Sequence, residues 1–180
     1  MKIGFLADTH SMKADGSDLP DAVLKAFKGV DRIVHLGDIG RKAILDRLAS
    51  VAPVWIQSED RKGYVPMAAP ASAPVKLFED TSGAKCGLVM NLANPDKKIK
   101  VAEDSSLSFD GALDVLLKKR FKDDVSAVAF GGTHAPYNVA HDGILFVNPG
   151  SPTMPMDFCP ATVAVLDLGT KPKAKIVEIA

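Results

Sequence analysis

The chain has 180 residues, with 22 Lys or Arg against 22 Asp or Glu, so its formal net charge at pH 7 is zero. Apolar residues make up 47% and charged residues 24%, which is typical of a globular protein with a sizeable core. A neutral chain gives no electrostatic reason to expect a nucleic acid or an anionic membrane as partner. No apolar run reaches the ~20 residues of a membrane span, and the N-terminus is too short and too soon acidic for a signal peptide. We therefore expect a cytoplasmic protein with one domain over residues 1–180.

The first third of the chain predicts a βαβαβ unit. Apolar runs indicate strands, and apolar residues three or four apart indicate helices. The unit comprises strands at 2–7, 32–36 and 53–57, a helix at 18–28 that Asp18 could cap, and a helix around 43–48. Such an order predicts parallel strands joined by helical crossovers.

The rest of the chain is richer in β-structure. Strands at 75–80 and 85–92 flank Ser82-Gly83 and predict a hairpin, and residues 108–120 have the spacing of an amphipathic helix. Further strands are expected at 125–130, 143–147, 161–168 and 173–179. The pattern predicts an α/β fold with one mixed sheet, a second sheet richer in hairpins, and helices on the outer faces. Cys86 and Cys159 lack C-x-x-C spacing and are expected to be reduced structural thiols.

Four short segments carry the chemistry, and each follows an apolar run. They are Asp8-Thr9-His10, Gly37-Asp38, Gly131-Gly132-Thr133-His134 and Asn148-Pro149-Gly150-Ser151. Open α/β sheets build their sites from loops at strand ends. The first three segments offer two carboxylates and two imidazoles, which suit Mn, Fe, Zn or a related divalent ion. His35, inside a predicted strand, is expected to be a buried structural histidine rather than a ligand.

With these motifs in this order, the chain resembles the calcineurin-like metallophosphoesterases, most closely their small prokaryotic phosphodiesterase branch. The resemblance extends from the N-terminal Asp-x-His to Asn-Pro-Gly-Ser. It implies a four-layer α/β/β/α sandwich of two mixed β-sheets flanked by helices. It also implies a two-metal site that hydrolyses phosphate esters.

The resemblance assigns site residues unevenly. Asp8, His10, Asp38 and His134 match the positions that hold the first metal, with Asp38 as the bridging carboxylate and Asp38 and His134 as the catalytic pair. At the second metal this chain departs from the family pattern. Glu59 stands where the family has Asn, Asn91 where it has His, and Gly132 where it has the first His of Gly-His-Thr-His.

Glu59 leaves two alternatives open. It could join Asp38 and Asn91 in an all-oxygen second site, which would favour Mg²⁺, Mn²⁺ or Ca²⁺ over Zn²⁺. It could instead pair with Arg61 or Lys62, or be solvated. For the whole site we expect a divalent metal, Mn, Fe, Zn, Ni or Mg, with one ion rather than two.

Three functions are compatible with this pattern. The first is a metal-dependent phosphoesterase of low activity, acting on a small phosphorylated molecule or a phosphodiester. The second is a non-catalytic scaffold for a protein partner or a second copy of the chain, for which a retromer subunit with this fold is the family precedent. A scaffold predicts an exposed apolar patch away from the motif loops. The third is a sensor that binds a phosphorylated ligand without turnover.

Overall fold

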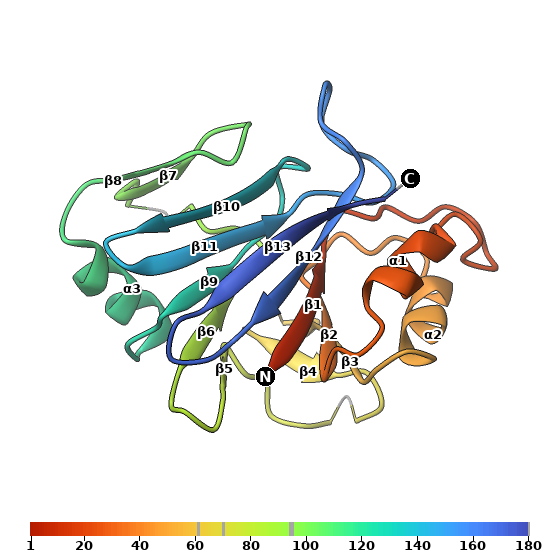
Figure 1. The fold of residues 1–180 in the computed structure, drawn as a ribbon, viewed down its shortest axis with the longest axis horizontal. Helices are drawn as coiled ribbons and strands as arrows, with labels where there is room; N and C mark the ends of the chain where they lie inside the picture. The colour runs from red at the N-terminus through yellow and green to blue at the C-terminus, as the bar shows by residue number, and fades with distance from the viewer. Residues whose placement is uncertain (61, 70, 94–95, 180) are drawn as a thin grey trace.

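Two β-sheets lie face to face, with helices on both outer faces (Figure 1). The computed structural model describes residues 1–60, 62–69, 71–93 and 96–179. The α1 and α2 helices cover one side and α3 covers the other, so the predicted four-layer α/β/β/α sandwich is confirmed. Among the described residues no helix is long and apolar enough to cross a membrane.

The first sheet has six strands in the order β13-β12-β1-β2-β3-β4. Strands β1, β2 and β3 are parallel, and helices α1 and α2 form the crossovers, which confirms the predicted βαβαβ opening. Strand β12 pairs antiparallel with the other edge of β1. The elements are β1 (Lys2–Leu6), α1 (Asp21–Ala26), β2 (Arg32–His35), α2 (Ala43–Ala49), β3 (Val54–Gln57), β4 (Tyr64–Pro66), β12 (Thr162–Asp167) and β13 (Lys173–Glu178).

The second sheet has five strands in the order β10-β11-β9-β6-β5. The predicted hairpin around Ser82-Gly83 is confirmed as the antiparallel β5–β6 pair, while β6, β9 and β11 run parallel. Strands β7 and β8 form a separate ribbon. The elements are β5 (Leu77–Glu79), β6 (Lys85–Leu88), β7 (Ile99–Val101), β8 (Leu107–Phe109), α3 (Leu113–Phe121), β9 (Ala127–Ala129), β10 (Pro136–His141) and β11 (Ile144–Pro149).

Three apolar clusters fill the spaces between the four layers. Strand β1 shows the alternation that builds them: Ile3, Phe5 and Ala7 pack between the sheets, whereas Leu6 packs toward α1 and α2. A strand turns successive side chains to opposite faces, so a strand buried on both sides contributes to two cores. The third cluster joins α3 and the β7–β8 ribbon to the second sheet through residues such as Phe146.

Two predicted helices begin later than expected. Helix α1 starts at Asp21 after Pro20, and the Asp18 carboxylate instead accepts hydrogen bonds from the Ser11 hydroxyl and the Met12 amide. Residues 107–109 form strand β8, and α3 begins only at Leu113. In both cases the apolar spacing begins before the helix does. Hydrogen bonds of the turn before α1, and of the β7–β8 ribbon before α3, take the place of a first helical turn.

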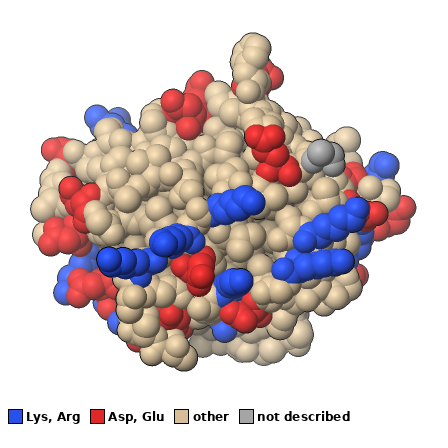
Figure 2. Space-filling model, in the orientation of Figure 1, with Lys and Arg blue, Asp and Glu red and all other residues tan. Residues whose placement is uncertain are grey.

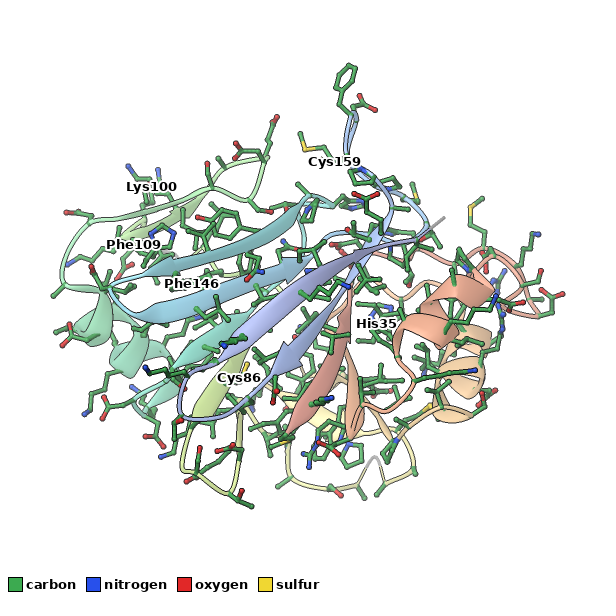
Figure 3. The ribbon with its side chains drawn as sticks, viewed as in Figure 1. His35, Cys86, Lys100, Phe109, Phe146 and Cys159 are labelled. Carbon is green, nitrogen blue, oxygen red and sulfur yellow. The ribbon has the colours of Figure 1, made fainter. Side chains whose placement is uncertain are left out.

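The surface and the thiols agree with the composition. Figure 2 shows Lys and Arg in a band across the sheet face toward the viewer, with Asp and Glu among and around them. Cys86 lies on β6 and Cys159 in the projecting loop after β11 (Figure 3), and both are free thiols. The fold also places the carboxyl ends of β1, β2, β9 and β11 at one edge of the sandwich, where the motif loops meet.

Candidate metal centre

Three of the predicted ligands form one cluster. Asp8 and His10 follow β1, His134 follows β9, and their ligand atoms lie within 4.8 Å of one another. An ion held by bonds of ~2.0–2.2 Å keeps its ligand atoms at most about 4.4 Å apart. Small side-chain rotations would therefore bring these three groups around one ion.

The backbone at the cluster is strained. Asp8, His10, Asp38 and His134 all have positive φ, between 40° and 61°. L-residues other than Gly rarely adopt this left-handed region, and such strain gathers at functional sites. Two hydrogen bonds between the loops hold it: the Asp8 amide donates to the Gly37 carbonyl (3.0 Å) and the His10 amide to the Asp38 carbonyl (2.9 Å).

The Asp8 carboxylate is buried and only half satisfied. Its Oδ2 accepts a hydrogen bond from the Gly132 amide (2.9 Å), but its Oδ1 is buried with no hydrogen-bond partner among the described residues. Burial raises the pKa of this carboxyl; the Gly132 amide and the charges of His134 and His10 oppose the rise, and Asp38 adds to it. A buried acceptor without a donor is costly. A cation at Oδ1 would remove that cost, so the donor set fits a divalent ion.

The imidazoles of His10 and His134 are oriented to bind a metal ion beside Asp8. The His134 Nδ1 lies 2.6 Å from the Met154 carbonyl, which only accepts, so Nδ1 donates this hydrogen bond and Nε2 is the nitrogen left to bind a metal. That Nε2 lies 3.9 Å from the unpaired Asp8 Oδ1. The His10 ring stacks on the His134 ring, with centroids 5.1 Å apart and planes 15° from parallel. A backbone carbonyl that fixes the tautomer of a histidine is the usual support of a metal ligand.

The Asn148–Ser151 segment supports the centre from behind. The Ser151 hydroxyl donates to the Asp8 carbonyl (2.8 Å), and the Asn148 side chain donates to the Thr133 hydroxyl (2.9 Å). Thr153, in the same loop, donates to the Thr9 carbonyl (2.6 Å). These bonds tie the last motif to the first and third, so the segment shapes the loops that carry Asp8 and His134.

Asp38 lies beside the cluster but does not join it. Its side chain is exposed, and the three-residue cluster found among the described residues leaves it out. Its charge still adds to the raised pKa of Asp8, behind the larger effect of burial, so the two carboxylates are neighbours. Asp38 as the bridging ligand and member of a catalytic pair stays a prediction.

The residues expected at the second metal do not converge. Glu59 is exposed and lines a groove with Ile39 and Lys42, and it is not part of the Asp8 cluster. The Asn91 side chain is also exposed and accepts a hydrogen bond from the Ala93 amide (3.0 Å). The alternative was an ion pair of Glu59 with Arg61 or Lys62. Arg61 lies outside the described residues, and Lys62 pairs with Asp60 (3.8 Å). A role for Glu59 and Asn91 at a second ion stays a prediction.

Met90 occupies this region instead. A Cβ built on Gly37 would lie 2.5 Å from the Met90 sulfur, and one on Gly131 3.3 Å from it, so the thioether packs against both glycines. Met90 was not predicted to belong to the site, although the alternation of side chains along β6 could have placed it there. Cys86 and Leu88 face the space between the sheets, and alternation with period two places Met90 on the same side and Asn91 on the opposite one.

His35 is the buried structural histidine that we expected. The Thr9 hydroxyl donates to the Ile39 carbonyl (2.8 Å), so it accepts a hydrogen bond from the His35 Nε2 (2.8 Å). Complete burial, with a smaller contribution from His10, lowers the pKa of His35 to about 3. The ring lies on β2 toward the α1 side of the first sheet (Figure 3) and is neutral at physiological pH.

Known proteins match this chain over nearly its whole length. A "probable metallophosphoesterase" from Methanothermobacter thermautotrophicus is 29% identical over 178 residues, which cover 99% of this chain and 92% of the relative. Among solved structures, a Zn²⁺ complex of Vps29 from Entamoeba histolytica has a TM-score of 0.62 at 16% identity and covers 99% of both chains. A novel archaeal phosphodiesterase has a TM-score of 0.61 at 17% identity and covers 99% of this chain and 100% of its own.

The family model of the calcineurin-like phosphoesterase superfamily domain matches residues 1–171. That span contains all four motif loops and every strand of the second sheet. The chain therefore belongs to the calcineurin-like phosphoesterase superfamily.

Proposed function

We propose that this protein is a metal-dependent phosphoesterase that hydrolyses a phosphate ester of a small molecule at one divalent ion, with low turnover. The observation that carries the proposal is the unpaired, buried Asp8 Oδ1, which faces the free Nε2 of His134. A fold of this size does not leave a carboxylate oxygen buried and unpaired without a reason. Family membership supplies the reaction class.

Asp8, His10 and His134 would hold the ion, and the exposed Asp38 side chain is free to turn toward it as a fourth ligand. A divalent ion supplies Lewis-acid polarisation of a phosphoryl oxygen and a water activated for attack. The residues supply the rest. The Gly132 amide fixes one oxygen of Asp8, the Met154 carbonyl fixes the His134 ring, and the left-handed loops aim both groups at one point.

The donor set favours some ions over others. Two imidazoles with carboxylate oxygens suit Mn²⁺, Fe²⁺, Ni²⁺ or Zn²⁺, whereas Mg²⁺ prefers oxygen ligands and water. The similar Vps29 protein from Entamoeba histolytica was solved as a complex with Zn²⁺. We propose one ion rather than two, because Asn91 and Gly132 stand where the family pattern has imidazoles, and the Asn91 side chain is exposed.

The alternative is a non-catalytic scaffold or a binder of phosphorylated ligands, and the altered second half favours it. Its predicted apolar patch gains no support, however. Of the large apolar side chains exposed among the described residues, Met12 follows the first motif, Met154 and Phe158 lie in the loop between β11 and β12, and Val115 and Val139 lie on α3 and β10.

The first experiment measures bound metal by mass spectrometry and hydrolysis of bis(p-nitrophenyl) phosphate with added Mn²⁺. We expect about one ion per chain and slow turnover, with both lost in His134→Asn and turnover lost in Asp38→Asn. His141→Asn is the matched control, because that imidazole pairs with the Tyr137 hydroxyl (2.7 Å) away from the centre. Metal-free protein that stays inactive with Mn²⁺, and is unchanged by Asp38→Asn, would overturn the enzyme proposal.

A further inference from the structure

A cavity of about 250 Å³ opens beside Met90, and none of the cluster residues Asp8, His10 and His134 lines it. Its walls come from the β3–β4 connection, from the end of β6 and from the last turn of α3. Six of its lining residues carry the inference: Gln57, Lys62, Tyr64, Lys76, Met90 and Arg120. Five of these six have no function predicted from the sequence, and the proposed phosphoesterase reaction uses none of them.

The cavity is strongly cationic in a chain whose net charge is zero. Lys62, Lys76 and Arg120 line it, and none of its lining residues is acidic. Lys62 has a carboxylate nearby, the exposed Asp60 at 3.8 Å, whereas Lys76 and Arg120 have no ion-pair partner among the described residues. The cavity therefore carries an excess of positive charge.

Arg120 is the most informative of the three cations. It is half-buried, and its guanidinium donates a hydrogen bond to the Asn91 carbonyl but to no carboxylate among the described residues. Burial lowers the pKa of this group, with the Tyr64 hydroxyl acting the other way. A half-buried cation without a counter-charge is costly to a fold. An anion held in the cavity would offset that cost.

The neutral groups of the wall are fixed by the loops of the metal centre. The Tyr64 hydroxyl donates to the Leu36 carbonyl (2.8 Å), and the Gly131 amide donates to the Met90 carbonyl (3.0 Å). The Gln57 side-chain oxygen lies 3.2 Å from the position of a Cβ on Gly37. The cavity is thus preformed and shares a wall with the loops that carry Asp38 and His134.

We propose that this cavity binds a small phosphate-bearing anion, either inorganic phosphate or the terminal phosphate of a phosphomonoester, independently of the metal ion. The Arg120 guanidinium offers a planar fork that matches two phosphate oxygens, and the two lysines supply mobile positive charge at the rim. The cavity is smaller than the ~300–1,000 Å³ of sites for drug-sized ligands, which agrees with a compact anion. This site does not depend on the proposed reaction.

The test is calorimetric titration of inorganic phosphate into protein freed of metal with a chelator, at low salt. Arg120→Gln should weaken binding roughly tenfold, because a hydrogen bond to a charged group is lost. Lys76→Gln, at a more exposed position, should weaken it roughly threefold. Lys118→Gln is the matched control, because this lysine lies on α3, pairs with Asp124 (3.1 Å) and does not line the cavity.

The outcomes separate this proposal from the metal centre. Asp8→Asn should leave phosphate affinity in the metal-free protein unchanged. Phosphate binding that Asp8→Asn abolishes and Arg120→Gln spares would place the anion at the metal centre and overturn the proposal, as would no binding at millimolar phosphate. Lys76→Gln keeps the test decisive should Arg120→Gln unfold, since removing an exposed lysine leaves the core intact.

Discussion

Replacing Asp8 with Asn should stabilise the metal-free protein while abolishing its response to metal. Asn has nearly the same shape, and its side-chain oxygen can still accept the hydrogen bond from the Gly132 amide. Its NH₂ group would then face the His134 Nε2, which lies 3.9 Å from the unpaired oxygen of Asp8. The substitution removes a buried charge and supplies a donor from which the Nε2 of a neutral His134 ring can accept a hydrogen bond.

The magnitude follows from the unpaired oxygen. Leaving a buried acceptor unsatisfied costs about 1–3 kcal/mol, so the variant should gain up to that amount in the absence of metal. For a chain of this size the gain corresponds to a rise in Tm of about 2–12 °C. In the opposite direction, an ion at one hundred times its Kd stabilises the wild type by about 2.7 kcal/mol. The two proteins should therefore exchange their order of stability when metal is added.

Thermal unfolding with chelator and with Mn²⁺ measures both halves of this prediction. The pH dependence adds a check. Because burial raises the pKa of Asp8 in the folded state, the folded chain binds more protons than the unfolded one above pH 3.8. Wild-type stability from this group therefore falls as pH rises, and the advantage of Asn should grow from pH 4 toward neutrality. A variant that melts below the wild type in chelator, or that keeps the Mn²⁺-dependent shift, would refute the reasoning.

Three further predictions concern other parts of the fold. Gly150→Ala should lower the free energy of unfolding by several kcal/mol in denaturant, because the φ of Gly150 is 67° and the new methyl group would overlap the buried Thr162 hydroxyl. Gly29→Ala, where φ is 81° and the space is open, should lower it by only about 1 kcal/mol. Equal losses in the two variants would contradict this account. Burial lowers the pKa of His35 from 6.5 to about 3. The unfolded chain therefore binds a proton at this residue before the folded chain does, and the free energy of unfolding falls as pH drops below 6.5, by roughly 4 kcal/mol at pH 3. In His35→Gln, the free energy of unfolding measured in urea should change less between pH 6.5 and pH 4 than in the wild type. Met90→His should raise the metal content toward two ions per chain, because the Met90 side chain packs against Gly37 and Gly131. Asn91→His should not, because the Asn91 side chain points away from the centre. The reverse result would support Asn91 as the residue at the second ion.

Local pattern was enough for most strands of the two sheets and for the first half of the site, but it did not indicate strands β4, β7, β8 and β10. Continuous apolar runs located β1, β2 and β9, and the polar motifs that follow them located Asp8, His10 and His134. These assignments succeed because strand ends in parallel sheets meet at one edge. The exact starts of α1 and α3 could not be read, since turn and ribbon hydrogen bonds compete with helix initiation there.

The sequence by itself determined the fold class, the order of the motifs and the residue types that could bind a metal, because each of these depends on neighbours along the chain. Only the tertiary structure decided that Oδ1 of Asp8 stays unpaired, that Asp38 stands outside the cluster, and that Met90 packs against Gly37 and Gly131. It alone gathered Arg120 with residues from β3, β4 and β6 around one cavity. Which side chains converge depends on how two separate sheets are stacked and how far each strand extends, and that contact information is long-range.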